Sequence, residues 1–188
     1  MRNGVIHDTI VLAAYESIAE RGVEQLRLQH VAEEAGIEES TLRESFATKT
    51  DLIAAVLEDI TRQFWCSVLD EGTPAERLRR HLTLLAEMVL ARPMLFVVLA
   101  DLEFHARRNP LVRSVVEDDE RGWRRALADI FRDGAEDAIW PPGLDEEAAV
   151  ELVIATAKGV RIAPEKARAV FEQLERILLQ SNRNHEEA

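Results

Sequence analysis

The fold is decided by residues 27–46, which read RLQHVAEEAGIEESTLRESF. Apolar residues recur at helical spacing from about Arg27 to Ala35, and a second short helix is expected from about Glu38 to Phe46. Gly36 and an apolar Ile37 separate the two, which lets the helices cross closely at a steep angle. This pattern is typical of a helix-turn-helix, although the spacing alone also fits the corner of any three-helix bundle.

A longer helix precedes this pair and ends at Glu20-Arg21-Gly22, where the glycine suits a left-handed cap. We expect Val31, Leu42 and Phe46 to fill the wedge between the two short helices and this first one.

The rest of the chain keeps helical spacing, and no segment alternates as a half-buried strand would. The Trp140-Pro-Pro-Gly143 stretch is the clearest loop. Further helices are expected at about 50–69, 74–91, 93–107, 110–134, 145–160 and 164–180. The sequence therefore predicts an all-α protein.

Composition narrows the class of protein further. With 188 residues, 47% of them hydrophobic and 31% charged, the chain is long enough for a sizeable core. Its one cysteine, Cys66, excludes an intrachain disulfide, and no apolar run is long enough for a bilayer, so a cytoplasmic protein without membrane contact is expected. The net charge of −12 repels phosphate at long range, which argues against indiscriminate nucleic-acid binding.

Several stretches resemble the TetR family of bacterial regulators. They are Ile10–Ala14, Glu20-Arg21-Gly22, Val31–Ile37, Thr41-Leu42 and Phe46–Leu52, followed by a Pro-rich loop, Asp145–Ala149 and Lys158-Gly159-Val160. The ending Phe46-x-Thr48-Lys49-x-x-Leu52 is the most specific piece. The order of the later elements agrees over nearly the whole chain, while the specific motifs lie within residues 6–57.

The resemblance implies two parts. Residues 1–50, called the headpiece here, would be a three-helix helix-turn-helix DNA-binding domain, and residues 51–188 a helical regulatory and dimerisation domain. The protein would be a ligand-responsive transcriptional regulator, a repressor rather than an enzyme, that binds double-stranded operator DNA as a homodimer. The DNA-binding residues carried over are Arg27, Glu39, Ser40, Thr41, Arg43, Ser45 and Lys49.

The headpiece departs from the family pattern in its charge. Arg27 and Glu38 stand where the family usually has a capping serine or threonine, and the headpiece holds five basic against nine acidic residues. Glu39 could accept a hydrogen bond from cytosine N4, whereas an acid at a helix start also suits the helix dipole without DNA. The alternative function is therefore a TetR-like interaction protein whose degenerate headpiece does not bind DNA.

In such a body a small apolar effector would lie among the helices, and ordinary core packing is the alternative for each candidate residue. The predicted pocket residues are Trp65, Cys66, His81, Met88, Phe96, Phe104 and Trp123. No cofactor, metal or catalysis is expected, because no histidine has a partner at zinc spacing and no phosphate loop or nucleophile elbow occurs.

The last two helices carry more apolar surface than one partner helix covers, which predicts a four-helix seam between two copies of the chain. The predicted interface residues are Leu152, Ala155, Gly159, Val170, Leu174, Ile177 and Leu178.

Overall fold

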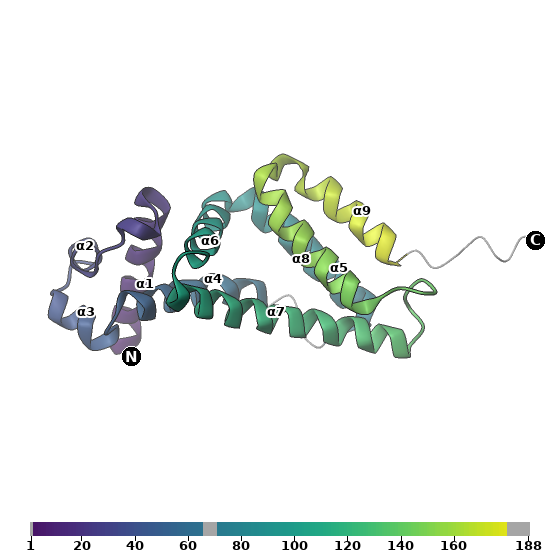
Figure 1. Cartoon of the computed structure of the whole chain (residues 1–188), viewed down its shortest axis with the longest axis horizontal. Helices are drawn as coiled ribbons and strands as arrows, with labels where there is room; N and C mark the ends of the chain where they lie inside the picture. The colour runs from purple at the N-terminus through teal and green to yellow at the C-terminus, as the bar shows by residue number, and fades with distance from the viewer. Residues whose placement is uncertain (1, 66–70, 180–188) are drawn as a thin grey trace, which may run out of the picture. The chain divides into compact units, whose positions relative to one another are not determined.

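The computed structural model describes residues 2–65 and 71–179, and over these residues it is helical with no strand (Figure 1). The helices are α1 (Arg2–Arg21), η1 (Val23–Gln25), α2 (Leu28–Glu34), α3 (Glu39–Ser45), α4 (Lys49–Trp65), α5 (Pro74–Ala91), α6 (Pro93–Ala106), α7 (Pro110–Glu136), α8 (Glu146–Gly159), η2 (Val160–Ile162), η3 (Pro164–Lys166) and α9 (Ala167–Leu179). The all-α prediction is confirmed, and the expected end of α4 near Leu69 lies outside the described residues.

The chain divides into two compact units. The first unit is Met1–Arg62 with Met94–Glu120, and the second is Gln63–Pro93 with Arg121–Ala188. The headpiece thus packs in one unit with α6 and the start of α7, and the functional division at residue 50 remains a prediction. Each unit is described by itself below.

The core of the first unit is built around the predicted wedge. Val31 and Leu42 are fully buried, and Phe46 is 4% exposed, so the expected packing of α2 and α3 is confirmed. The chain turns out of α1 at Gly22, whose φ of 81° is the left-handed conformation that glycine adopts without strain. From α4, Leu52, Ile53 and Val56 add fully buried side chains to this unit.

In the second unit α5 packs along α9. The start of α5 is the predicted one: Thr73 Oγ1 accepts from Glu76 N, the Glu76 carboxylate accepts from Thr73 N (2.9 Å), and Pro74 occupies the first turn. Phe171 of α9 is buried in this interface, and the nearly buried Arg77 of α5 pairs with Asp133 of α7 at 2.8 Å.

The C-terminal end of α7 corrects the prediction of a stop at Gly134, because the helix continues to Glu136. Gly134 instead makes room for the loop: a Cβ there would lie 2.3 Å from the ring of Trp140. That ring packs on Phe131 at 5.1 Å between centroids, and its Nε1 donates to the Phe131 carbonyl (2.6 Å). Gly134 is therefore required for the close approach of the Trp140 ring to α7.

Over the described part of the chain, no single helix is both long and apolar enough to cross a membrane. The helices α5 and α6 pass such a test only when they are joined across the bend between them, and their main apolar side chains are buried in the protein.

Candidate nucleic-acid interface

The two short helices of the headpiece start without side-chain caps. Arg27 and Glu38 are the N-cap residues of α2 and α3, both have extended backbone, and neither side chain bonds to the helix start. This follows from the sequence, because neither residue is a good capping type. The two helices are therefore held by their buried apolar residues rather than by local bonds at their starts.

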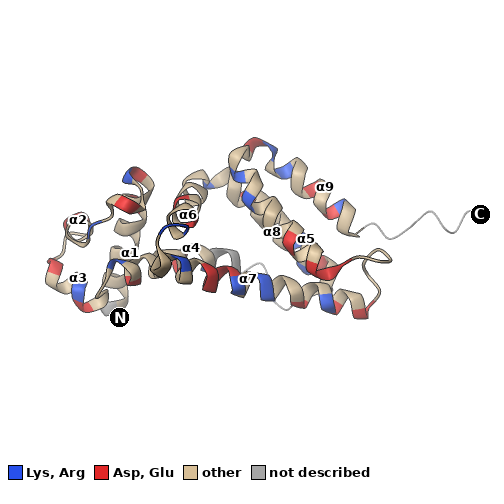
Figure 2. Cartoon of the chain, in the orientation of Figure 1, with Lys and Arg blue, Asp and Glu red and all other residues tan. Residues whose placement is uncertain are grey.

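The exposed side of α3 carries most of the predicted DNA-binding side chains. Ser40, Arg43 and Ser45 are exposed, and Glu39 and Thr41 are half-buried. Arg43 is already paired, since its guanidinium lies 2.6 Å from the Glu39 carboxylate one turn earlier. Figure 2 shows the mixture of acidic and basic residues along this helix. An exposed pair of this kind contributes only about 0.3–0.5 kcal/mol to stability, so DNA could separate it at little cost.

The two predicted basic residues outside α3 meet at one carbonyl oxygen. Arg27 Nη1 and Lys49 Nζ donate to the Glu24 carbonyl of η1, at 2.9 and 3.1 Å. Partial burial, and then the nearby guanidinium of Arg27, lower the pKa of Lys49 from its ordinary value. The structure thus brings Arg27 and Lys49 together, which the sequence did not indicate.

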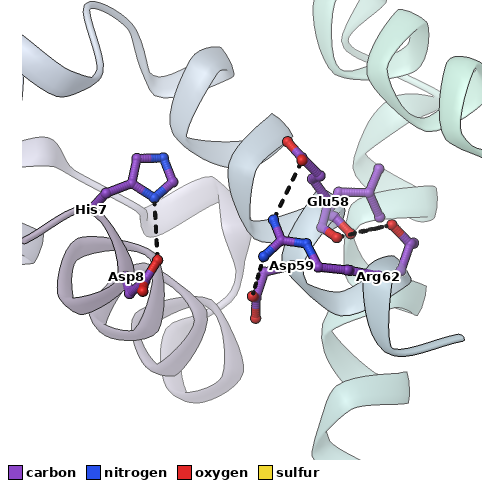
Figure 3. Close-up of polar contacts among 7 residues, drawn as sticks. His7, Asp8, Glu58, Asp59 and Arg62 are labelled. Atoms are coloured by element: carbon purple, nitrogen blue, oxygen red, sulfur yellow. Dashed lines mark hydrogen bonds and ion pairs between the residues drawn. The ribbon is translucent and has the colours of Figure 1, made fainter. Parts of the chain in front are cut away.

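Local pairing is also found at the far end of α4. Figure 3 shows Arg62 bound to Glu58 and Asp59 of its own helix, at 3.4 and 4.0 Å, and His7 beside Asp8 on α1 at 3.6 Å. These pairs are exposed and lie on the surface of the first unit. Arg62, like Arg43, is therefore engaged by carboxylates of its own helix.

One contact in the first unit escaped the sequence analysis. Asp101 of α6 accepts a hydrogen bond from the backbone N–H of Val23 in η1 (2.6 Å), and His105 Nδ1 of α6 lies 3.8 Å from the Glu24 carboxylate. The partners are about 80 residues apart in the chain, so no local pattern could have signalled these contacts.

Asp119 of α7 is a further acidic residue of the first unit, and its pKa is raised to about 6. Burial is the main cause, while a hydrogen bond with Thr61 of α4 acts in the opposite direction, and Glu120 and Glu103 add smaller upward contributions. This carboxyl group was not among the predicted site residues.

The predicted pocket residues are only partly brought together. In the second unit, Trp123 Nε1 donates to Nε2 of the fully buried His81 (2.9 Å), and Met88 is also buried. Burial lowers the pKa of His81 to about 4, so the ring is neutral near pH 7. In the first unit Phe96 is buried, whereas Phe104 is 56% exposed and its ring faces the Arg108 guanidinium at 5.2 Å. Cys66 and the side chain of Trp65 lie outside the described residues.

An open groove of about 220 Å³ lies between α5 and α9. None of the predicted pocket residues lines it. Its walls are Leu82, Thr83, Ala86, Glu87, Arg168, Phe171, Glu172 and Glu175.

The predicted interface residues of the last two helices divide into two groups. Leu174 and Leu178 are 4% and 1% exposed, so they pack inside the chain. The prediction that these two residues lie at the interface between two copies is therefore corrected. The reason is the position of α9, whose face bearing Phe171, Leu174 and Leu178 lies against its own subunit. The exposed members are Leu152, Ala155, Gly159, Val170 and Ile177.

A headpiece of this geometry joined to a helical body defines a class, the helix-turn-helix transcriptional regulators. Residues 10–56 match the sequence profile of the bacterial regulatory proteins of the tetR family. The N-terminal part of the chain is therefore a helix-turn-helix domain of the TetR type, the domain of a family of transcriptional regulators.

Individual relatives agree with this assignment. The chain is 26% identical over 156 residues to the fatty acid metabolism regulator protein of Bacillus subtilis (strain 168), covering 78% of this chain and 77% of that protein. A TetR-family transcriptional regulator from Rhodococcus sp. has the same fold, with a TM-score of 0.82 at 20% identity and coverage of 93% and 98%. The transcriptional regulator FadR from Bacillus subtilis, solved in complex with stearoyl-CoA, has the same fold with a TM-score of 0.77 at 20% identity. The match covers 90% of this chain and 98% of that chain.

Proposed function

We propose that the protein binds operator DNA as a homodimer, represses transcription from the site it occupies, and releases it when a small apolar effector binds. The observation that carries this proposal is α3: a short helix fixed by the buried Leu42, with Ser40, Arg43 and Ser45 exposed on its outer side. A helix of this kind presents side chains to the major groove, while basic residues beside it bind phosphates.

The homodimer is supported by the exposed apolar residues of the last helices. Leu152 is 43% exposed, Val170 37% and Ile177 53%, and Ile162 between them is 89% exposed. Large apolar side chains exposed on two helices that pack together are typical of a subunit interface. Two-fold symmetry would then match two half-sites about one DNA turn apart.

For the effector, we propose a fatty acyl-CoA, whose acyl chain is the apolar part that would lie among the helices. The support is the printed function of the Bacillus subtilis relative and the stearoyl-CoA bound to FadR. Titration with acyl-CoAs of increasing chain length, with free CoA and free fatty acid as controls, should release the DNA only for some acyl-CoAs. Release by none of them, from a protein that does bind DNA, contradicts the acyl-CoA proposal alone.

The second candidate is an interaction protein that has lost DNA binding. It is favoured by one specific observation: Arg43 is paired with Glu39, and Lys49 with the Glu24 carbonyl, in a headpiece with more acidic than basic residues. Opposed to it is the low cost of separating the exposed Arg43–Glu39 pair. The Lys49 ammonium has three donors, so it can bind a phosphate while it keeps its contact with the Glu24 carbonyl.

The test is selection from random duplexes at low salt, followed by titration of the enriched site. Arg43→Ala and Lys49→Ala should each weaken binding to all sequences and lower the salt slope by about one. Glu39→Gln should relax preference at one base by about 1–3 kcal/mol with little change in slope. Arg132→Ala and Lys166→Ala, at exposed sites of the second unit, are the matched controls. Failure to enrich any palindrome with a folded dimer would leave the interaction protein as the function.

A further inference from the structure

The short turn η1 is held from two directions. On one side lie Asp101 and His105 of α6, and on the other Arg27 and Lys49. We propose that Asp101 and His105 are positioning residues: they fix η1, and through the Glu24 carbonyl they place Arg27 and Lys49 for phosphate contact. This inference rests on the proposed DNA binding.

Asp101 provides the stronger of the two contacts from α6. Val23 is fully buried, so its N–H cannot bond to water and needs an acceptor inside the protein. The Asp101 carboxylate is that acceptor, at 2.6 Å. The turn approaches α6 closely here, because a Cβ at Gly22 would stand 3.4 Å from the same carboxylate oxygen. Loss of this acceptor leaves a buried donor unpaired and frees the turn.

The orientation of His105 follows from its neighbour Asn109. The Asn109 side-chain oxygen accepts from the first amides of α7, Leu111 N at 3.0 Å and Val112 N at 3.4 Å. Its NH₂ group is therefore left to donate to His105 Nε2 (3.3 Å), which places the ring proton on Nδ1. Nδ1 is buried without a hydrogen-bond partner, and the Glu24 carboxylate lies 3.8 Å from it. The ring thus directs a positive dipole at Glu24.

The other side of the turn carries the DNA contacts. The Glu24 carbonyl accepts from Arg27 Nη1 and from Lys49 Nζ. Arg27 Nη1 also donates to the Leu26 carbonyl (3.2 Å), so both cations are held by backbone oxygens of this turn. Asp101 also attracts Lys49 electrostatically. A shift of α6 that moves Val23 therefore also moves the Glu24 carbonyl, to which both side chains are hydrogen-bonded. These contacts link α6 to the predicted DNA-binding side chains of the headpiece.

The first experiment needs no DNA. Hydrogen exchange of the segment 22–27 is measured in the full protein for Asp101→Ala and Asp101→Asn. Alanine removes the acceptor for Val23 N–H, so we expect exchange at least about tenfold faster there, whereas asparagine keeps an acceptor oxygen and should retain protection. Asp137→Ala, at an exposed position after α7, is the matched control and should leave this segment unchanged. Equal exchange in all four proteins overturns the proposal.

The second experiment uses the enriched duplex. Asp101→Ala should weaken binding about tenfold and lower the salt slope by about one, because a misplaced Lys49 or Arg27 loses its phosphate. Asp101→Asn should restore most of the affinity. In a double-mutant cycle with Lys49→Ala the two losses should not add, since both act on one contact. Additive losses or an unchanged slope overturn the positioning role, because general destabilisation lowers the active fraction without changing the slope.

The two failures differ in what they show. A wild-type protein that selects no duplex retires the proposed DNA binding and with it the role assigned to Asp101. A wild-type protein that selects a duplex, with Asp101→Ala binding it equally well, overturns the positioning role alone.

Discussion

The helices of the headpiece and those of the second unit are stabilised in different ways. α2 and α3 have seven residues each and no side-chain cap, whereas the 18-residue α5 begins with a complete capping box, and α8 begins with Asp145 bonded to Ala148 N. Isolated helices shorter than about 12 residues are marginal in water, so α2 and α3 depend on tertiary packing. The surface predicted to read DNA is thus presented by the helices with the least local support.

The positions of the tryptophans make this difference measurable. All three, Trp65, Trp123 and Trp140, belong to the second unit, while the headpiece has a tyrosine, Tyr15, and no tryptophan. Tryptophan fluorescence therefore follows the second unit, and circular dichroism follows the helices of both.

The largest effects are expected from the buried anchors of the two units. Phe171→Ala should lower the free energy of unfolding by about 3–5 kcal/mol, and Leu42→Ala by about 2–5 kcal/mol, since each leaves a cavity in a filled core. Denaturant titration with both probes should show the two variants acting on different signals. Phe171→Ala moves the fluorescence transition, while Leu42→Ala shifts part of the circular dichroism signal to lower denaturant.

Coincident transitions in Leu42→Ala would contradict this, because they would mean that the two units unfold as one. The exposed Leu12→Ala on α1 is the matched control for Leu42, and we expect a change within about 0.5 kcal/mol.

The next largest effect is a pH dependence of the stability of the second unit, caused by His81. Burial lowers the pKa of His81 in the folded chain to about 4, from an ordinary value of 6.5. Between these two pH values the unfolded chain binds a proton at His81 and the folded chain does not. Stability is complete above pH 6.5 and falls toward pH 4, by up to about 3 kcal/mol. The fluorescence midpoint in denaturant should follow this course, and His81→Gln, which keeps an acceptor for Trp123, should flatten it. The matched control is His30→Gln at an exposed headpiece position; an equal pH response in both variants would contradict the assignment.

A smaller loss is expected at the end of α7. Gly134→Ala should destabilise by about 1–3 kcal/mol, because its Cβ would overlap the buried Trp140 ring and force the loop outward. Tryptophan emission should shift to the red as Trp140 meets water. Gly4→Ala, in a helical position of α1 with no atom near its Cβ, is the control and should be neutral or stabilising. An unshifted emission in Gly134→Ala would show that the loop accommodates the methyl group.

The sequence predicted most of this fold because the deciding signals are local. Thr73-Pro74 and Glu76 specify a helix start within four residues, and the spacing of Val31, Leu42 and Phe46 specifies which faces are buried. The limits of α2 and α3 were correct to within one or two residues for the same reason. The close approach at Gly134 was not predicted, because it depends on the Trp140 ring, which packs against Gly134 from the following loop.

The candidate site could be predicted only as far as single side chains. The residues of α3 follow from their place in the helix-turn-helix, but the contact of Asp101 with Val23 joins segments 78 residues apart. The burial of Leu174 and Leu178 was also hidden, because apolar spacing does not say whether a face packs on its own chain or on a second copy. Which partner covers a face is a tertiary property, and only the packing of α9 along α5 decides it.

The smallest effects test the capping difference itself. Thr73→Ala removes a cap that α5 has and should cost about 1 kcal/mol in the fluorescence transition. Glu38→Ser supplies a capping type that α3 lacks and should add about 0.5 kcal/mol in circular dichroism, since the new cap is partly offset by the loss of an acid near the helix start. Each change has a control on the same or the adjacent helix. Thr83→Ala in the middle of α5 should be neutral or slightly stabilising, and Glu33→Ser in α2 should cost a few tenths of a kcal/mol. If Glu38→Ser destabilises as Glu33→Ser does, the start of α3 is not limited by its missing cap, and packing around Leu42 alone sets its stability.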